Sequence, residues 1–104
     1  MEIQFNTDKN IEGTERLESY VSETVQKSLK HFDERITRVE VHLSDENADK
    51  GGERDKKCVL EARPRGMDPI AVTSQEDSIE KSLNNALNKL KAALKNALGK
   101  AGVR

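Results

Sequence analysis

The sequence feature that most constrains the fold is a long apolar stripe near the C-terminus. Residues between Ile79 and Leu98 place nine apolar side chains within an arc of about 140° when successive residues turn by about 100°. This spacing predicts an amphipathic helix, which the glycines at Gly99 and Gly102 should end. Such a helix is stable only against another apolar surface, so the rest of the chain must supply one.

Four shorter segments alternate apolar and polar residues, which is typical of strands with one buried face. They lie at residues 3–5, 36–43, 57–63 and 70–72. Between the first two, residues 14–32 carry apolar residues at helical spacing after a Thr14 N-cap, and predict a second amphipathic helix. Residues 44–54 are polar and contain two adjacent glycines, which indicates a loop.

The predicted order is therefore β-α-β-β-β-α in an α/β (α+β) two-layer sandwich, with two helices packed on one face of a four-stranded sheet. The first two strands flank a helix, so we expect them to be parallel, and the last three to form an antiparallel meander. Residues 64–66 predict a turn, and Ser74 is the expected N-cap of the last helix. The 104 residues make one domain, with an ordered core at about 1–98 and a flexible tail at 99–104.

Composition excludes several classes of protein. Charged residues are 36% and mean hydropathy is −0.83, and no apolar run approaches the length of a membrane-spanning helix. The N-terminus lacks the basic and apolar segments of a signal peptide, so we expect a cytoplasmic protein with no membrane partner. The single Cys58 excludes an internal disulfide and should pack in the core.

The sequence contains no recognisable motif of a catalytic site or a metal site. His31 and His42 have no ligand-spaced partner, so we expect no metal, and no phosphate-binding glycine loop is present. The chain is therefore predicted not to be an enzyme, and to need no cofactor and no small-molecule substrate. Phe5, Tyr20 and Phe32 are interpreted as buried, which disfavours base stacking on single strands.

Charge is distributed unevenly along the chain. The net charge is −1, yet from Lys81 to Arg104 there are six basic residues and no acidic one. This segment suits a polyanion such as RNA, although a solvated helix face with lysines near the negative end of the dipole is the alternative. On the helical projection, lysines and asparagines form one exposed stripe and a second flank: Lys81, Asn84, Asn88, Lys91 and Lys95, then Lys89, Asn96 and Lys100.

Several strings resemble one family, the ribosome hibernation-promoting factors or ribosome-associated inhibitor proteins. Residues 14–17 through Lys27 to residues 32–36 (Phe-Asp-Glu-Arg-Ile) are similar to the family's first helix and its exit. Glu76-Asp77 resembles the acidic entry to its last helix, and residues 82–94 resemble that helix without a gap. The likeness spans nearly the whole chain.

The resemblance implies a non-enzymatic factor that binds the small ribosomal subunit through rRNA. Such factors occupy the path of mRNA and tRNA and repress translation under stress. Lys27 and Lys89 stand where the family usually has lysine, and other lysines lie nearby. We therefore expect the RNA-binding residues to be Lys27, Lys30, Lys81, Lys89, Lys91, Lys95 and Lys100. The chain resembles the short form of the family, which lacks a C-terminal dimerisation domain, and we expect a monomer off the ribosome.

Other positions depart from the family pattern and leave alternatives open. Glu18, Thr24, Glu80 and Ala92-Ala93 replace basic, aromatic or glutamine residues that the family often has. One alternative is a divergent protein-interaction module on the same fold that does not bind ribosomes. Its binding surface would be the charged face of the sheet: Arg38, Glu40, His42, Glu61 and Arg63. A weaker alternative is general binding of double-stranded RNA.

Overall fold

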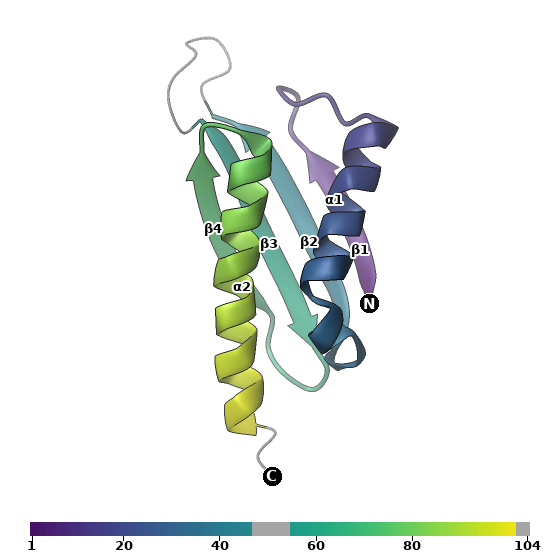
Figure 1. Cartoon of the computed structure of the whole chain (residues 1–104), viewed down its shortest axis with the longest axis vertical. Helices are drawn as coiled ribbons and strands as arrows, with labels where there is room; N and C mark the ends of the chain where they lie inside the picture. Colours follow the sequence, from purple (N-terminus) through teal and green to yellow (C-terminus); the bar gives the residue numbers. More distant parts are fainter. Residues whose placement is uncertain (47–54, 102–104) are drawn as a thin grey trace.

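The computed structural model describes residues 1–46 and 55–101, and its elements follow the predicted order (Figure 1). The fold is an α+β sandwich of a four-stranded sheet and two helices, with a short 3-10 helix between the first helix and the second strand. The elements are β1 (Glu2–Thr7), α1 (Glu15–Ser28), η1 (Lys30–Arg35), β2 (Ile36–Asp45), β3 (Lys56–Pro64), β4 (Ile70–Glu76) and α2 (Ile79–Ala101).

The strands lie in the order β1-β2-β3-β4, with the pairing that the sequence predicts. β1 is parallel to β2, with Ile3 opposite Val39. β2, β3 and β4 form an antiparallel meander, in which Leu60 lies opposite both Val41 and Val72. β4 therefore runs in the same direction as β1. Because each helix returns along the sheet after one of these strands, α1 and α2 are parallel to each other (Figure 1).

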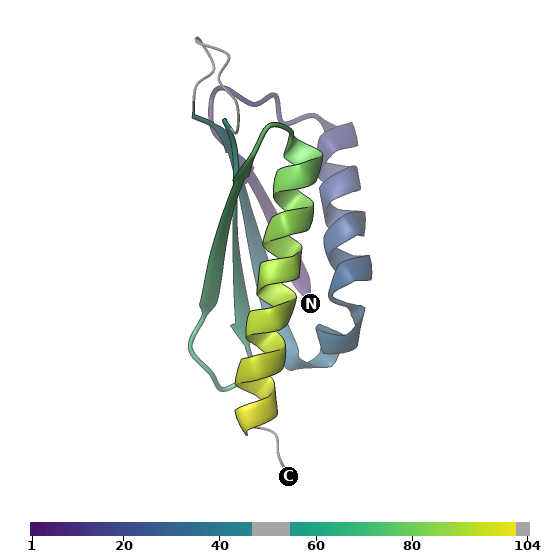
Figure 2. The ribbon, with the colours of Figure 1, turned by 60° about the vertical axis from the view of Figure 1, so that its left-hand side comes forward.

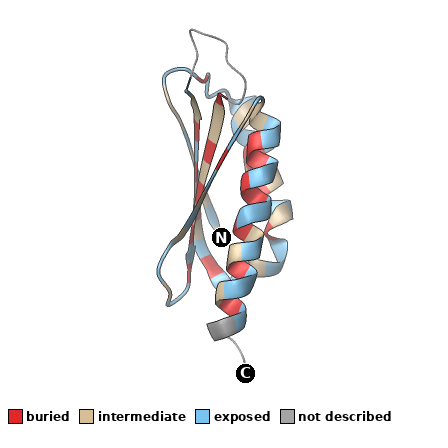
Figure 3. Cartoon of the chain, turned by 90° about the vertical axis from the view of Figure 1, so that its left-hand side faces the viewer, coloured by how far each residue is buried: buried red, intermediate tan, exposed pale blue. Residues whose placement is uncertain are grey.

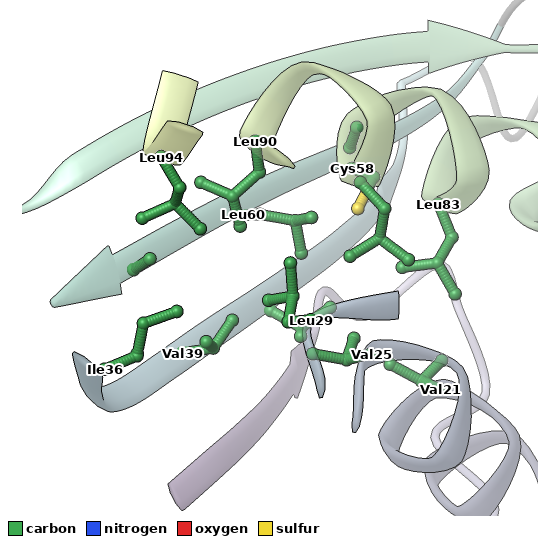
Figure 4. Close-up of a cluster of buried hydrophobic side chains, with 14 of the residues drawn as sticks. Val21, Val25, Leu29, Ile36, Val39, Cys58, Leu60, Leu83, Leu90 and Leu94 are labelled. Atoms are coloured by element: carbon green, nitrogen blue, oxygen red, sulfur yellow. The ribbon is translucent and has the colours of Figure 1, made fainter. Parts of the chain in front are cut away.

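Both helices cover the same face of the sheet and leave the other face open (Figure 2). The core lies between the two layers, where Leu29 of the α1 C-cap, Leu60 of β3 and Leu90 of α2 are fully buried (Figure 4). Cys58 is also fully buried in this core, as the sequence predicts. No helix in the described part of the chain is sufficiently long and apolar to cross a bilayer.

The first helix is shorter than predicted, because its last turn tightens. α1 ends at Ser28, and residues 30–35 form the 3-10 helix η1 instead of continuing to residue 32. The amide of Phe32 donates to the carbonyl of Leu29 at 2.9 Å, which is the i→i+3 bond of a 3-10 turn. This turn keeps Leu29 buried and packs Phe32 against the core.

The last helix starts later and ends later than predicted. β4 continues to Glu76, so Ser74 is a buried strand residue, and Ser78 caps α2 by accepting the amide of Lys81 at 3.1 Å. Gly99 does not stop the helix, which reaches Ala101. Helices often end at a glycine with a left-handed φ, but among the described glycines only Gly66, in the predicted turn, has such a φ. The tail was expected at residues 99–104, but residues 99–101 belong to α2, and the rest of it lies outside the described residues, as does most of the predicted loop, residues 47–54.

Candidate nucleic-acid interface

The outer flank of α1 faces the first strand of the sheet. Gln26 and Lys30 line a pocket of about 320 Å³ with Met1 and Asp33. The amino group of Met1 forms an ion pair with Asp33 at 3.4 Å, which joins the start of the chain to η1. Gln26 lies about 100° around the helix from the buried Val25. The opposite flank of α1 therefore faces α2.

The outer flank of α2 faces the edge strand β4. Asn85 donates its side-chain amide to Oε2 of Glu76 at 2.8 Å, and Lys89 donates its ammonium to the carbonyl of Thr73 at 2.7 Å. Both side chains lie on one side of the helix, about 100–140° from the buried Leu90. The flank on the other side of Leu90 therefore faces α1.

Three of the predicted lysines lie on the outward side of the helix layer, turned toward the space between the two helices. Lys27 comes from α1, and Lys91 and Lys95 come from α2, where Asn84 and Asn88 share their side. We call these five residues the inter-helix surface. The outward sides of both helices are largely exposed, while their buried stripes face the sheet (Figure 3). Within the described residues, none of the three lysines forms an ion pair or a hydrogen bond.

The other predicted lysines lie elsewhere. Lys81 forms an ion pair with Asp77 at 3.2 Å near the start of α2, and Lys89 lies against the edge of β4. Lys30 lies on the β1 flank of the molecule, beside the pocket described above. The side chain of Lys100 is outside the described part of the chain. RNA binding by these four residues stays a prediction, as it does for the inter-helix lysines.

Three glutamates lie at the opposite end of the helix layer from Lys91 and Lys95. Glu15 and Glu18 lie in the first turn of α1, and Glu80 lies in the first turn of α2. Because the helices are parallel, these carboxylates share the end where the helix dipoles are positive, which is where acids are favourable. Lys91 and Lys95 follow three to four turns later. These three carboxylates would oppose a phosphate beside the first turns of the helices, whereas Lys91 and Lys95 would attract one in the second half of α2.

Among the aromatic residues, Tyr20 is the one that the sequence analysis placed wrongly. It was expected to be buried, yet its exposed fraction is 38%, and it is the one exposed large hydrophobic residue that the structure describes. Phe5 and Phe32 are partly buried and pack against the core. Tyr20 lies about 140° from Val25 on the side of α2, whereas a core residue should lie within about 100°. The helical projection alone could therefore have shown its exposure.

The open face of the sheet carries charges that pair with one another. Glu40 forms ion pairs with Arg38 at 2.7 Å and with Arg63 at 3.5 Å, and His42 lies 3.5 Å from it. Arg63 also lies 3.4 Å from Glu61. In these contacts the charges of two arginines and two glutamates balance each other. In the described part of the chain, no cluster of three or more His, Cys, Asp or Glu side chains could hold a metal ion.

Comparisons with known proteins agree with this architecture. The N-terminal domain of Thermus thermophilus Protein Y superposes with a TM-score of 0.72 at 18% identity, covering 92% of this chain and 98% of that one. A ribosomal subunit interface protein from Coxiella burnetii gives a TM-score of 0.73 at 16% identity, covering 95% and 99%. At such identities the likeness shows the fold alone. No curated protein matches the sequence.

The family model described as Sigma 54 modulation protein / S30EA ribosomal protein matches residues 5–101. This match covers nearly all of the strands and helices and agrees with the resemblance to the ribosome hibernation-promoting factors that the local strings carry. The chain therefore belongs to the Sigma 54 modulation protein / S30EA ribosomal protein family.

Proposed function

We propose that the protein is a cytoplasmic, non-enzymatic factor that binds the small ribosomal subunit through rRNA and represses translation. The family supports ribosome association, and the structure supports a nucleic-acid partner. The observation that carries the proposal is the inter-helix surface, where Lys27, Lys91 and Lys95 lie on one side without an ion pair or hydrogen bond to the described residues. Lysines without carboxylate partners keep their full attraction for phosphate.

The physical mechanism is neutralisation of phosphates by side chains on a rigid support. Each lysine that contacts a phosphate releases condensed counterions, which makes binding weaker as salt increases. The amides of Asn84 and Asn88 add neutral hydrogen-bond donors for sugar and phosphate oxygens. Both helices are anchored by fully buried side chains such as Val25 and Leu90, so the backbone positions from which these groups extend are fixed before binding.

Co-sedimentation with purified small subunits across a salt series tests the binding. We expect saturable binding that weakens steeply with salt. Replacement of Lys27, Lys91 and Lys95 by Gln should lower the slope of log K against log salt by about two to three, because each lost phosphate contact lowers it by about 0.7–0.9. Binding with an unchanged slope would show that these lysines do not contact RNA.

Translation is repressed, in this proposal, because the bound protein occupies the path of mRNA and tRNA. Small subunits preloaded with mRNA and tRNA should then bind the protein at least tenfold more weakly than empty subunits do. Addition of the protein before mRNA should also inhibit translation in a purified system. Equal binding to loaded and empty subunits would contradict occlusion while leaving ribosome association intact.

A further inference from the structure

We propose that Tyr20 stacks on an unpaired RNA base while the inter-helix lysines hold the phosphates beside it. This inference rests on the proposed function and names the chemistry that it recognises: a nucleotide whose base is free of pairing. Single strands and loops present such bases, whereas a continuous duplex does not.

The exposure of Tyr20 is the first observation. Its side chain is not part of the core, and its exposed fraction of 38% contrasts with the fully buried Val21 next to it. Tyrosine exposes an aromatic face that can stack on any base, and such stacking contributes substantially to binding of single strands. The ring lies outside the core cluster, and it is the one large hydrophobic side chain that the described residues leave exposed, so it is available to a partner outside the chain.

The position of Tyr20 relative to the lysines is the second observation. Lys27 lies seven residues later on nearly the same side of α1, about 10 Å further along the helix axis. Between them lies Thr24, whose small side chain donates its hydroxyl to the carbonyl of Tyr20 at 2.7 Å. On the α2 side of the line from the ring to Lys27 the intervening side chain is therefore small, while Glu23 lies on the other side of that line. A nucleotide stacked on Tyr20 would have the phosphates that follow it within reach of Lys27.

The charges around Tyr20 favour a base over a phosphate at that point. Arg16 lies four residues before it and Glu23 three residues after it, both exposed on the outward side of α1. Their charges oppose each other, which leaves the ring in a locally neutral part of the surface. On the facing flank of α2, Asn84 offers a neutral amide that can donate to, or accept from, the edge of a base.

Tyrosine fluorescence tests the stacking directly. The chain contains one tyrosine and no tryptophan, so its intrinsic emission comes from Tyr20 alone. A single-stranded oligoribonucleotide should quench this emission with a saturable dependence on concentration, because a stacked base contacts the ring. A duplex of the same composition should leave the emission nearly unchanged. Binding of the single strand, followed by anisotropy of a label on the RNA, with no loss of tyrosine emission would overturn the proposal.

Substitutions at Tyr20 separate aromatic stacking from other contacts. Tyr20→Phe should bind small subunits within about twofold of the unmodified protein, whereas Tyr20→Leu should bind at least about fivefold more weakly, as expected for the loss of one stacked base. Gln26→Leu is the matched control, because it places leucine on the exposed β1 flank of the same helix. Tyr20→Leu binding as tightly as the control would overturn the proposal, as would Tyr20→Phe binding as weakly as Tyr20→Leu.

The two proposals fail in different ways. If small subunits do not bind the unmodified protein at all, the proposed function is wrong, and quenching by single-stranded RNA still decides whether Tyr20 stacks. If small subunits bind and the Tyr20 variants do not differ from the control, the ribosome is the partner and the stacking proposal is wrong. Circular dichroism of each variant checks that the fold is kept.

Discussion

Cys58 shows how burial alone changes the chemistry of a residue. Its side chain is fully buried in β3, and desolvation raises the pKa of its thiol from 9.0 to about 12. The thiolate is the reactive form of cysteine, so a thiol with this pKa stays protonated at neutral pH. Cys58 therefore behaves as a small apolar core residue, which is the role that its place in the strand alternation predicts.

The raised pKa of Cys58 predicts a loss of stability in alkali. Below pH 9 both states keep the thiol protonated, so burial has its full stabilising effect. Between pH 9 and about 12 only the unfolded state releases this proton, and the free energy of unfolding should fall by up to about 1.4 kcal/mol per pH unit. Urea unfolding at pH 8, 9.5 and 10.5 should show this decline relative to Cys58→Ala, which shares every other titrating group. Parallel pH profiles for the two proteins would contradict it.

At the scale of elements, the ends of the helices depend on single hydroxyl groups. Thr14 caps α1 by accepting the amide of Leu17 at 3.1 Å, as the sequence predicts. Ser78 caps α2, although the sequence favoured Ser74. Both serines precede an acidic residue and the apolar stripe, so local pattern does not separate them. Pairing of β4 with β3, where Ser74 lies opposite Cys58, decides in favour of Ser78 because it holds Ser74 in extended backbone.

Removal of the caps should destabilise the protein by a predictable amount. Thr14→Ala and Ser78→Ala should each lower the free energy of unfolding by about 1 kcal/mol, because each leaves an amide of the first helical turn without its side-chain acceptor. Ser74→Ala is the control, since its hydroxyl does not cap the helix, and it should cost less than Ser78→Ala. Urea unfolding measures all three. A larger loss for Ser74→Ala than for Ser78→Ala would show that the cap is assigned to the wrong serine.

At the scale of the whole molecule, positively charged side chains lie on two opposite faces. They form ion pairs with carboxylates on one face and form none with the described residues on the other. On the open face of the sheet, Arg38 and Arg63 form ion pairs with Glu40. On the helix layer, Lys91 and Lys95 have no such partner among the described residues. Both pairs contribute equally to the net charge of the protein, so net charge does not distinguish the proposed binding face from the open face of the sheet. The two pairs differ in the face on which they lie and in whether a carboxylate neutralises them.

Two double variants with the same change in charge should therefore affect RNA binding differently. Lys91→Gln with Lys95→Gln should lower the salt slope of small-subunit binding by about 1.4–1.8, because two phosphate contacts would be lost. Arg38→Gln with Arg63→Gln should leave that slope nearly unchanged, because these side chains lie on the far face of the sheet. Sedimentation across a salt series measures both, after thermal unfolding confirms that both are folded. Equal effects would mean that the protein binds through general attraction and not through the helix layer.

The sequence by itself determined the order of the elements, their pairing into two layers and the identity of most core residues. Strand and helix periods differ, and most of the large apolar residues must be buried together, so the pattern allows few arrangements. The exact ends of some helices could be assigned only from the structure, because adjacent residues are equally suited to end or start the helix. Examples are the end of α1 at Ser28 and the start of α2 after Ser78. At these points the local sequence is compatible with both outcomes, and tertiary packing selects one.

Only the tertiary structure decided which lysines lie together. A helical projection places Lys89 and Lys91 on opposite flanks of the same apolar stripe, but it does not say which neighbour packs beside each flank. The position of α2 between β4 and α1 settles this: Lys89 donates to the carbonyl of Thr73, while Lys91 joins Lys27 on the inter-helix surface. Residues that share one face of a helix are determined locally. Residues that share one surface of a molecule depend on how the helices dock on the sheet, which burial of the whole core decides.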